Sequence, residues 1–244
     1  MEPIKVTFQL ASPLFLDSEY PIHLDALLAY ACSKDLEAGG NENCWDSEVL
    51  DGVLCDYLDK SDVTSDGQWV WKASRLLYKQ TSELIFTNQI RKADPERFYQ
   101  NFFCEENPDG AVVKRFMKDG SPAKVNPETL KFDTLSGQQR GYQWFAASRW
   151  VQDVTAYAIG LPEGIEYLLQ THIKHIGKIG RNGFGRVKSI KVEAHTGNSE
   201  DWMIRTLPTG MQGKTGERYA SVQACVRAPY WRKTDRVMAM EWVD

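Results

Sequence analysis

Apolar and polar residues alternate at the start of the chain and then change to a helical spacing. Residues 4–10, IKVTFQL, place apolar side chains at every second position, which is the period of a half-buried β-strand. Within 23–33 the apolar residues follow helical spacing, and Asp25 near the start suits the positive end of a helix dipole. A strand followed by a helix is the first half of a ferredoxin-like βαβ unit.

A second helix and several more strands are predicted further along. Residues 162–175 carry apolar side chains at helical spacing, which predicts an amphipathic helix, and 187–192 has a short strand pattern. A turn at 107–110 precedes 112–118, which we interpret as the return arm of a hairpin. Alternation predicts the remaining strands, at 69–71, 75–79, 83–91, 151–158, 202–205, 219–227 and 236–242. Together these elements indicate an α+β fold.

Length, cysteine content and hydropathy limit the class of protein. A chain of 244 residues is long enough for one large domain or two small ones. Its five cysteines are odd in number and form no C-x-x-C pair, which favours reduced thiols in the cytoplasm over a zinc site. We recognise no signal peptide and no apolar run near the roughly 18 residues of a membrane span. We therefore expect a cytoplasmic protein with no membrane association and no cofactor.

Charge is distributed unevenly along the chain. The net charge is -4, but residues 1–70 hold 14 acids and 3 bases, whereas 71–244 hold 19 acids and 26 bases. Ten of the acids lie in 35–66, where Lys60 is the one base. Since such a segment repels nucleic acid, we expect it to face solvent or a protein partner. The basic remainder leaves nucleic acid open as a partner.

The most distinctive stretch is the glycine-rich, basic segment 171–193. It contains six bases and one acid, and four of its glycines fall within nine residues. Glycines allow positive φ and close approach to a ligand, successive N–H groups can form an anion-binding concavity, and cationic side chains pair with phosphate. We predict a polyanion-binding loop, with a glycine-rich turn and solvated charges as the alternative. Its candidate contact residues are Lys174, His175, Gly177, Lys178, Gly180, Arg181, Asn182, Gly183, Phe184, Gly185 and Arg186.

The order of elements around this segment excludes the common nucleotide-binding loops. A Rossmann fingerprint runs from strand to loop to helix, whereas here a helix precedes the loop and a strand follows it. A Walker A loop needs a Gly-Lys-Ser/Thr sequence that is absent here. The loop contains one aromatic residue, Phe184, placed either to pack or to stack on a base.

Two further groups of residues are candidates for nucleic-acid contact. Arg140, Tyr142 and Arg149 lie close in sequence to several aromatic residues, a composition typical of surfaces that stack bases. The alternative is that the aromatics Trp144, Phe145 and Trp150 belong to the core. His23, at the start of the first predicted helix, is either a capping or packing residue or an RNA-contacting residue.

The sequence from Gly177 to Val187, GKIGRNGFGRV, resembles the glycine-rich loop of the repeat-associated (RAMP) proteins of CRISPR systems. Residues 10–31 look like the opening of the type IV CRISPR effector subunit in the Cas-five, handle-capping position. The resemblance implies a single ferredoxin-like, RRM-related RAMP domain. Its expected parts are a core at 1–34 and 128–195, an insertion at 35–127 with a β-hairpin thumb within 91–127, and a C-terminal β extension at 196–244.

The same resemblance implies a function. We expect a non-catalytic subunit that grips the 5′ handle of CRISPR RNA and joins other protein subunits in a DNA-targeting complex, with target DNA as a further candidate partner. Some members of the superfamily cleave RNA without metal, so the alternative is a metal-independent endoribonuclease in which His23 or His175 acts as acid or base. A structural scaffold is the third interpretation.

Overall fold

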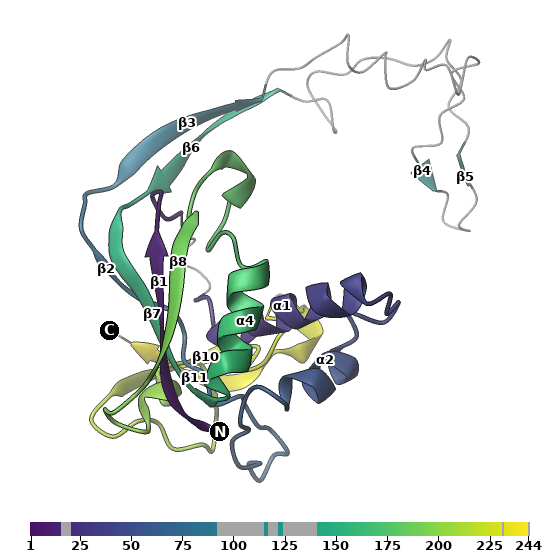
Figure 1. Cartoon of the computed structure of the whole chain (residues 1–244), viewed down its shortest axis with the longest axis vertical. Helices are drawn as coiled ribbons and strands as arrows, with labels where there is room; N and C mark the ends of the chain where they lie inside the picture. The colour runs from purple at the N-terminus through teal and green to yellow at the C-terminus, as the bar shows by residue number, and fades with distance from the viewer. Residues whose placement is uncertain (16–20, 92–114, 117–121, 124–140, 231, 244) are drawn as a thin grey trace. The chain divides into compact units, whose positions relative to one another are not determined.

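The computed structural model describes residues 1–15, 21–91, 115–116, 122–123, 141–230 and 232–243. Two compact units are present, one made of Met1–Ile85 with Ala147–Asp244 and the other of Phe86–Ala146. The protein is a mixed α/β structure with several antiparallel sheets and few helices. Figure 1 shows the elements of both units in chain order by colour.

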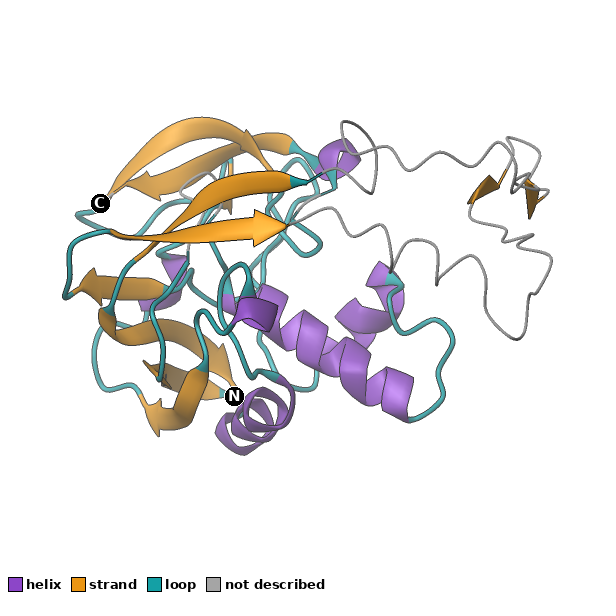
Figure 2. Cartoon of the chain, turned by 90° about the horizontal axis from the view of Figure 1, so that it is seen from above, coloured by secondary structure: helices purple, strands orange, loops and turns teal. Residues whose placement is uncertain are grey.

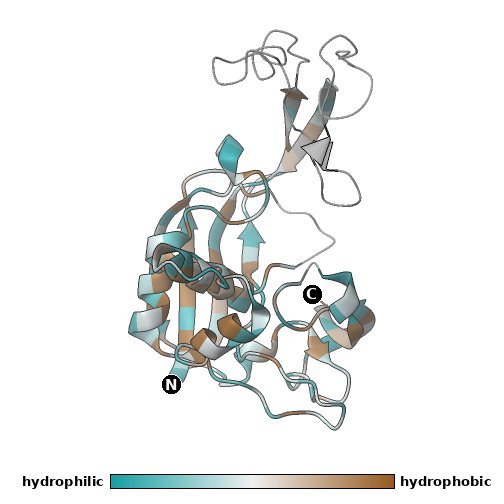
Figure 3. Cartoon of the chain, turned by 90° about the vertical axis from the view of Figure 1, so that its right-hand side faces the viewer, coloured by the Kyte–Doolittle hydropathy of each residue, from teal (hydrophilic) through white to brown (hydrophobic). Residues whose placement is uncertain are grey.

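The first unit is built on a four-stranded antiparallel sheet. Its spatial order is β2 (Leu77–Gln80), β7 (Val151–Gly160), β1 (Glu2–Leu10) and β8 (Val187–Ala194). The predicted alternation along β1 is confirmed for Ile4, Val6 and Phe8, which are fully buried, while Lys5 and Thr7 between them are only partly buried. Alternating hydrophobic and hydrophilic positions are visible along the strands in Figure 3.

Helices cover the apolar face of this sheet. They are α1 (Leu24–Ala38) and α4 (Pro162–His172), whose buried leucines join the strands in the main core. Figure 2 shows the helices gathered on one side of the strands of this unit. A further helix, α2 (Ser47–Leu54), was not predicted, although Asp46 caps it by accepting hydrogen bonds from the N–H groups of Glu48 and Val49.

The C-terminal part of the first unit forms a second sheet. Its order is β10 (Arg218–Ala224), β11 (Val237–Val243) and β9 (Leu207–Pro208), with antiparallel pairing. A smaller core beneath it includes Trp202, Leu207 and Val226. The strand predicted at 202–205 was wrong, because a short 3-10 helix spans Asp201–Met203. Residues 69–71 are also not a strand and form only an isolated bridge at Trp71.

The second unit contains most of a two-stranded ribbon and a small hairpin. The ribbon pairs β3 (Ile85–Arg91) with β6 (Tyr142–Ser148), and the hairpin pairs β4 (Arg115–Phe116) with β5 (Pro122–Ala123). This hairpin falls within the predicted thumb region 91–127, most of which lies outside the described residues. The predicted insertion at 35–127 differs from the structure, because β2 belongs to the main sheet and the second unit begins only at Phe86.

Candidate nucleic-acid interface

The glycine loop, residues 173–186, leaves the C-terminus of α4 and enters β8. Within it the chain makes a single 3-10 turn at Gly180–Asn182. Positive φ angles occur at Gly177 (83°), Ile179 (60°), Gly183 (90°) and Gly185 (59°). The chain therefore folds back on itself tightly, as the glycine content predicts.

Two of the glycines are required by contacts within the protein. A Cβ atom at Gly177 would lie 2.4 Å from the carbonyl oxygen of Phe15, and one at Gly185 would lie 1.9 Å from that of Ile176. No side chain fits at either distance. At both positions the glycine allows a close approach of the chain to itself.

A bracing segment, residues 11–15, runs along the loop and fixes it. The amides of Gly185 and Lys178 donate to the carbonyls of Pro13 (2.8 Å) and Phe15 (3.1 Å), and the amide of Arg186 donates to Ser12 Oγ (2.8 Å). The amide of Ala11 donates in return to the Arg186 carbonyl at 2.7 Å. The N–H groups of Lys178, Gly185 and Arg186 therefore have protein acceptors and are not available to an anion.

Phe184 belongs to this internal packing. It is 8% exposed, and its ring lies edge-on to that of Phe15 with centroids 6.4 Å apart. Of the two interpretations of Phe184, packing is therefore supported. Phe184 is not available to stack on a base.

The polar and cationic side chains of the loop point outward. Exposed positions include His175, Lys178, Arg181, Asn182 and Arg186. Lys174 is also exposed, but its Nζ caps α4 by donating to the carbonyl of Gln170 at 2.7 Å. A braced backbone with exposed cations is suited to binding phosphate by side chains.

The bracing segment also brings one distant candidate to the loop. Leu14 and Arg149 exchange backbone hydrogen bonds of 2.8 and 3.0 Å, which places Arg149 beside the segment that fixes the loop. Of the other candidates, Arg140 lies outside the described residues, and Tyr142 lies in β6 with its side chain outside them.

The aromatic residues near these candidates are not core. Trp144 is 36% exposed, Phe145 is 64% exposed and Trp150 is 40% exposed. The alternative that they fill the hydrophobic core was therefore wrong. Trp150 follows Arg149 in the first unit, whereas Trp144 and Phe145 belong to the ribbon of the second.

Comparison with known families agrees with the resemblance in the glycine loop. A model of the Csf3 family, described as CRISPR type IV associated protein Csf3, matches residues 2–242. The chain belongs to this family. The predicted resemblance to a type IV CRISPR protein is confirmed at that level, and the match includes the segment 48–131, for which no motif was recognised. Comparison with curated proteins gives no match.

In this member of the Csf3 family, His23 does not lie on a surface. It is 2% exposed and its ring stacks on that of Tyr230, with centroids 4.4 Å apart. The amide of Thr206 donates to its Nε2 at 3.4 Å, and within the described part of the chain its Nδ1 has no partner. His23 is the N-cap residue of α1 by position, but its side chain makes no capping bond. The packing role is supported, and the predicted RNA contact does not fit this burial.

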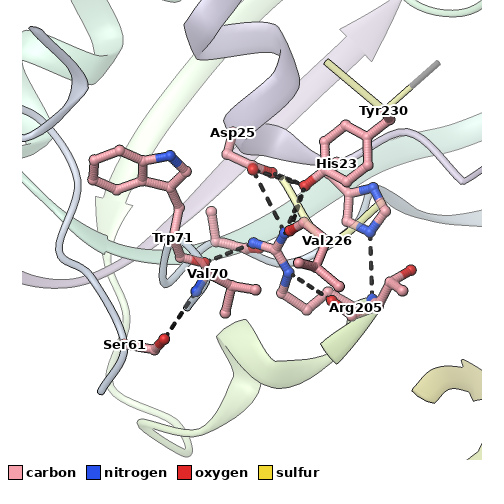
Figure 4. A network of polar contacts seen from close by, with 10 residues as sticks. His23, Asp25, Ser61, Val70, Trp71, Arg205, Val226 and Tyr230 are labelled. Atoms are coloured by element: carbon pink, nitrogen blue, oxygen red, sulfur yellow. Dashed lines mark hydrogen bonds and ion pairs between the residues drawn. The ribbon is translucent and has the colours of Figure 1, made fainter. Parts of the chain in front are cut away.

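His23 adjoins a buried network that sequence reasoning missed (Figure 4). Arg205 and Asp25 are both fully buried and lie 3.5 Å apart, and the Tyr230 hydroxyl donates to Asp25 Oδ2 at 2.7 Å. The guanidinium of Arg205 also donates to the carbonyls of Trp71 (2.6 Å), Ala73 (2.8 Å) and Val226 (2.8 Å). The network ties the start of α1 to the C-terminal part of the first unit. The acidic residue at the helix start was visible in the sequence, but its distant partner was not.

Burial sets the protonation of His23. Together with the charges of Arg205 and Arg75, burial lowers the pKa of His23 well below its usual value of 6.5. The unfolded chain therefore binds a proton near pH 6.5 that the folded chain does not bind. Stability should be complete above about pH 6.5 and fall as the pH drops below it.

The test of this pH dependence compares the wild type with His23→Gln, which retains an acceptor but does not titrate. Burial raises the pKa of Asp25, although Arg205 opposes that rise. The effect of Asp25 on the pH dependence of stability is therefore opposite in sign to that of His23, and it is present in both proteins. Urea unfolding at about pH 7.5 and about pH 5.5 should show a larger loss of stability in the wild type. Equal losses in the two proteins would contradict a neutral, buried His23.

His195 forms a second pair that was not predicted. Its Nε2 lies 2.6 Å from Asp201 Oδ2, and Lys214 Nζ lies 2.8 Å from the other oxygen of the same carboxylate. Although partial burial opposes it, hydrogen bonds from Lys214 and His195 lower the pKa of Asp201. β8 begins at the glycine loop, and this group of three side chains lies after the other end of β8. The group links the main sheet to the C-terminal part of the first unit.

The residues that the structure describes contain no group of three or more histidine, cysteine, aspartate or glutamate side chains placed to hold a metal ion. Nor is any helix among them long and apolar enough to cross a membrane. The glycine loop, its bracing segment and Arg149 therefore form the candidate interface.

Proposed function

We propose that the protein is a non-catalytic, cytoplasmic CRISPR RNA-binding subunit of a type IV effector ribonucleoprotein. In this proposal it grips the 5′ handle of the RNA and joins other protein subunits in assembling the DNA-targeting complex. The observation that carries the proposal is the set of exposed cations on a backbone held rigid by residues 11–15. A rigid backbone reduces the entropy lost when side chains engage a phosphate chain.

The topology supports the finer assignment to a ferredoxin-like RAMP fold. Along the chain the main elements run β1, α1, β2, β7, α4, β8, and the sheet order is β2-β7-β1-β8. That is a strand–helix–strand arrangement repeated, with the two halves interleaved in one antiparallel sheet. The glycine loop then occupies the connection between the second helix and the last strand.

The environment of the histidines supports binding without cleavage. His23 is buried, and His195 is engaged with Asp201. His175 is exposed, but its side chain forms no hydrogen bond or ion pair with any residue that the structure describes. A general base normally needs a partner that sets its orientation and pKa.

Incubating the purified protein with CRISPR repeat RNA in EDTA tests this part of the proposal. We expect a retarded complex on a native gel and intact RNA on a denaturing gel. Cleavage at one phosphodiester that leaves a 2′,3′-cyclic phosphate, and that disappears in His175→Ala, would establish the endoribonuclease instead. His172→Gln is the matched control, because His172 is paired with Asp35.

A further inference from the structure

A cleft of about 710 Å³ opens along the edge strand of the main sheet. Its walls are β2, the start of β7 and two residues of β11, Glu241 and Trp242. This volume is in the range of pockets that hold organic ligands.

The rim of the cleft carries polar side chains that are not used by the fold. Within the described residues, Lys79, Gln80, Gln152 and Asp153 form no side-chain hydrogen bond or ion pair. Amide and carboxylate groups of this kind are the donors and acceptors that read base edges. The cleft is lined by three such groups, those of Gln80, Gln152 and Asp153, and by the ammonium group of Lys79, all available for a ligand.

Aromatic surface is present beside these groups. Tyr78 on β2 lines the cleft and is 39% exposed. Trp242 also lines the cleft, and the guanidinium of Arg75 lies 4.3 Å from its ring, while its Nε1 donates to Glu217 at 2.8 Å. The indole of Trp242 is therefore held in place, and the ring of Tyr78 is the one accessible for stacking.

The charge of the cleft differs from that of the glycine loop. Arg75 and Lys79 among its lining residues are matched by Asp153 and Glu241. A site without net charge is poorly suited to phosphate but well suited to an uncharged base. The loop and the cleft thus favour different parts of a nucleotide.

The two sites are physically connected. Leu14 of the bracing segment and Ile176 of the glycine loop both line the cleft. Leu14 also pairs with Arg149, one of the predicted RNA contacts. The cleft therefore adjoins the glycine loop, so one RNA strand is able to reach both.

We propose that this cleft receives unpaired bases of the RNA whose backbone the glycine loop grips, with Tyr78 stacking and Gln80, Gln152 and Asp153 contacting base edges. The inference rests on the proposed RNA binding and adds the source of base preference. In this proposal, the glycine loop determines the affinity for RNA and its salt dependence, whereas the cleft distinguishes one base from another.

Filter binding of short oligo(A), oligo(C) and oligo(U) RNA tests the inference. Tyr78→Ala should weaken binding about tenfold, since one stacked base is lost, without changing the salt dependence. Gln80→Ala with Gln152→Ala should reduce the differences among the three oligomers. The control is Tyr167→Ala, which removes a more exposed tyrosine (58% against 39%) from α4 and should have no effect.

The outcomes separate this inference from the function on which it rests. RNA binding that is normal in Tyr78→Ala, or a wild type that binds all three oligomers equally, would overturn the base-reading cleft and leave the loop intact. A folded wild type that binds none of the oligomers would overturn both. Circular dichroism of each variant establishes that it is folded.

Discussion

Replacing Arg205 by alanine is expected to lower the free energy of unfolding by about 3–5 kcal/mol. The guanidinium is fully buried, and its removal leaves the Asp25 carboxylate without its cationic partner. It also leaves the carbonyls of Trp71, Ala73 and Val226 without the hydrogen bonds that Arg205 donates. Urea unfolding measures the change.

The matched control for this substitution is Arg232→Ala. Arg232 also pairs with a carboxylate, Asp235 at 3.4 Å, but both side chains are more than 40% exposed. An exposed pair contributes about 0–1 kcal/mol, so the control should remain close to the wild type.

If Arg205→Ala does not fold, Arg205→Lys, which retains the charge, should give a measurable intermediate loss of stability. A loss below about 1 kcal/mol in Arg205→Ala would contradict the stabilising role of the network.

The second large effect is expected on RNA binding. Replacing Lys178, Arg181 and Arg186 together by alanine should weaken binding of CRISPR RNA about 100-fold at about 0.1 M salt, if each contributes one phosphate contact. All three are exposed, so the substitutions leave the packing of Phe184 and the bracing hydrogen bonds of the backbone in place. A fluorescence-anisotropy titration measures the affinity.

The chain offers a closely matched control for this triple variant. Arg232, Lys233 and Arg236 also comprise two arginines and one lysine, and they lie between β10 and β11 rather than in the glycine loop. Replacing these three by alanine removes the same total charge. If the two triple variants lose affinity equally, binding depends on overall charge rather than on the loop.

Local periodicity was sufficient to predict most of the regular elements. The strand predicted at 4–10 is β1 (Glu2–Leu10), and the helix predicted at 23–33 is α1 (Leu24–Ala38). The helix before the glycine loop and the strand after it were also correct, because each has one clearly apolar face. Local periodicity therefore predicts the elements on both sides of the loop.

The features that were missed depend on distant or weak signals. Arg205 was assigned to a strand, and nothing local indicates that its partner, Asp25, lies 180 positions earlier in the chain. α2 was missed because its acidic composition obscured a good capping residue, Asp46. The internal contact of Gly177 with Phe15 was not predicted, because residues 11–15 are far away in sequence.

The most direct test of the central claim is the salt dependence of RNA binding in the wild type and the loop variant. For a single strand, each phosphate contact contributes about 0.7 to the slope of log affinity against log salt. We predict that the slope of the Lys178, Arg181 and Arg186 triple variant is smaller by about 2, whereas the Arg232, Lys233 and Arg236 variant retains the wild-type slope. An unchanged slope in a folded loop variant would contradict phosphate binding by the glycine loop.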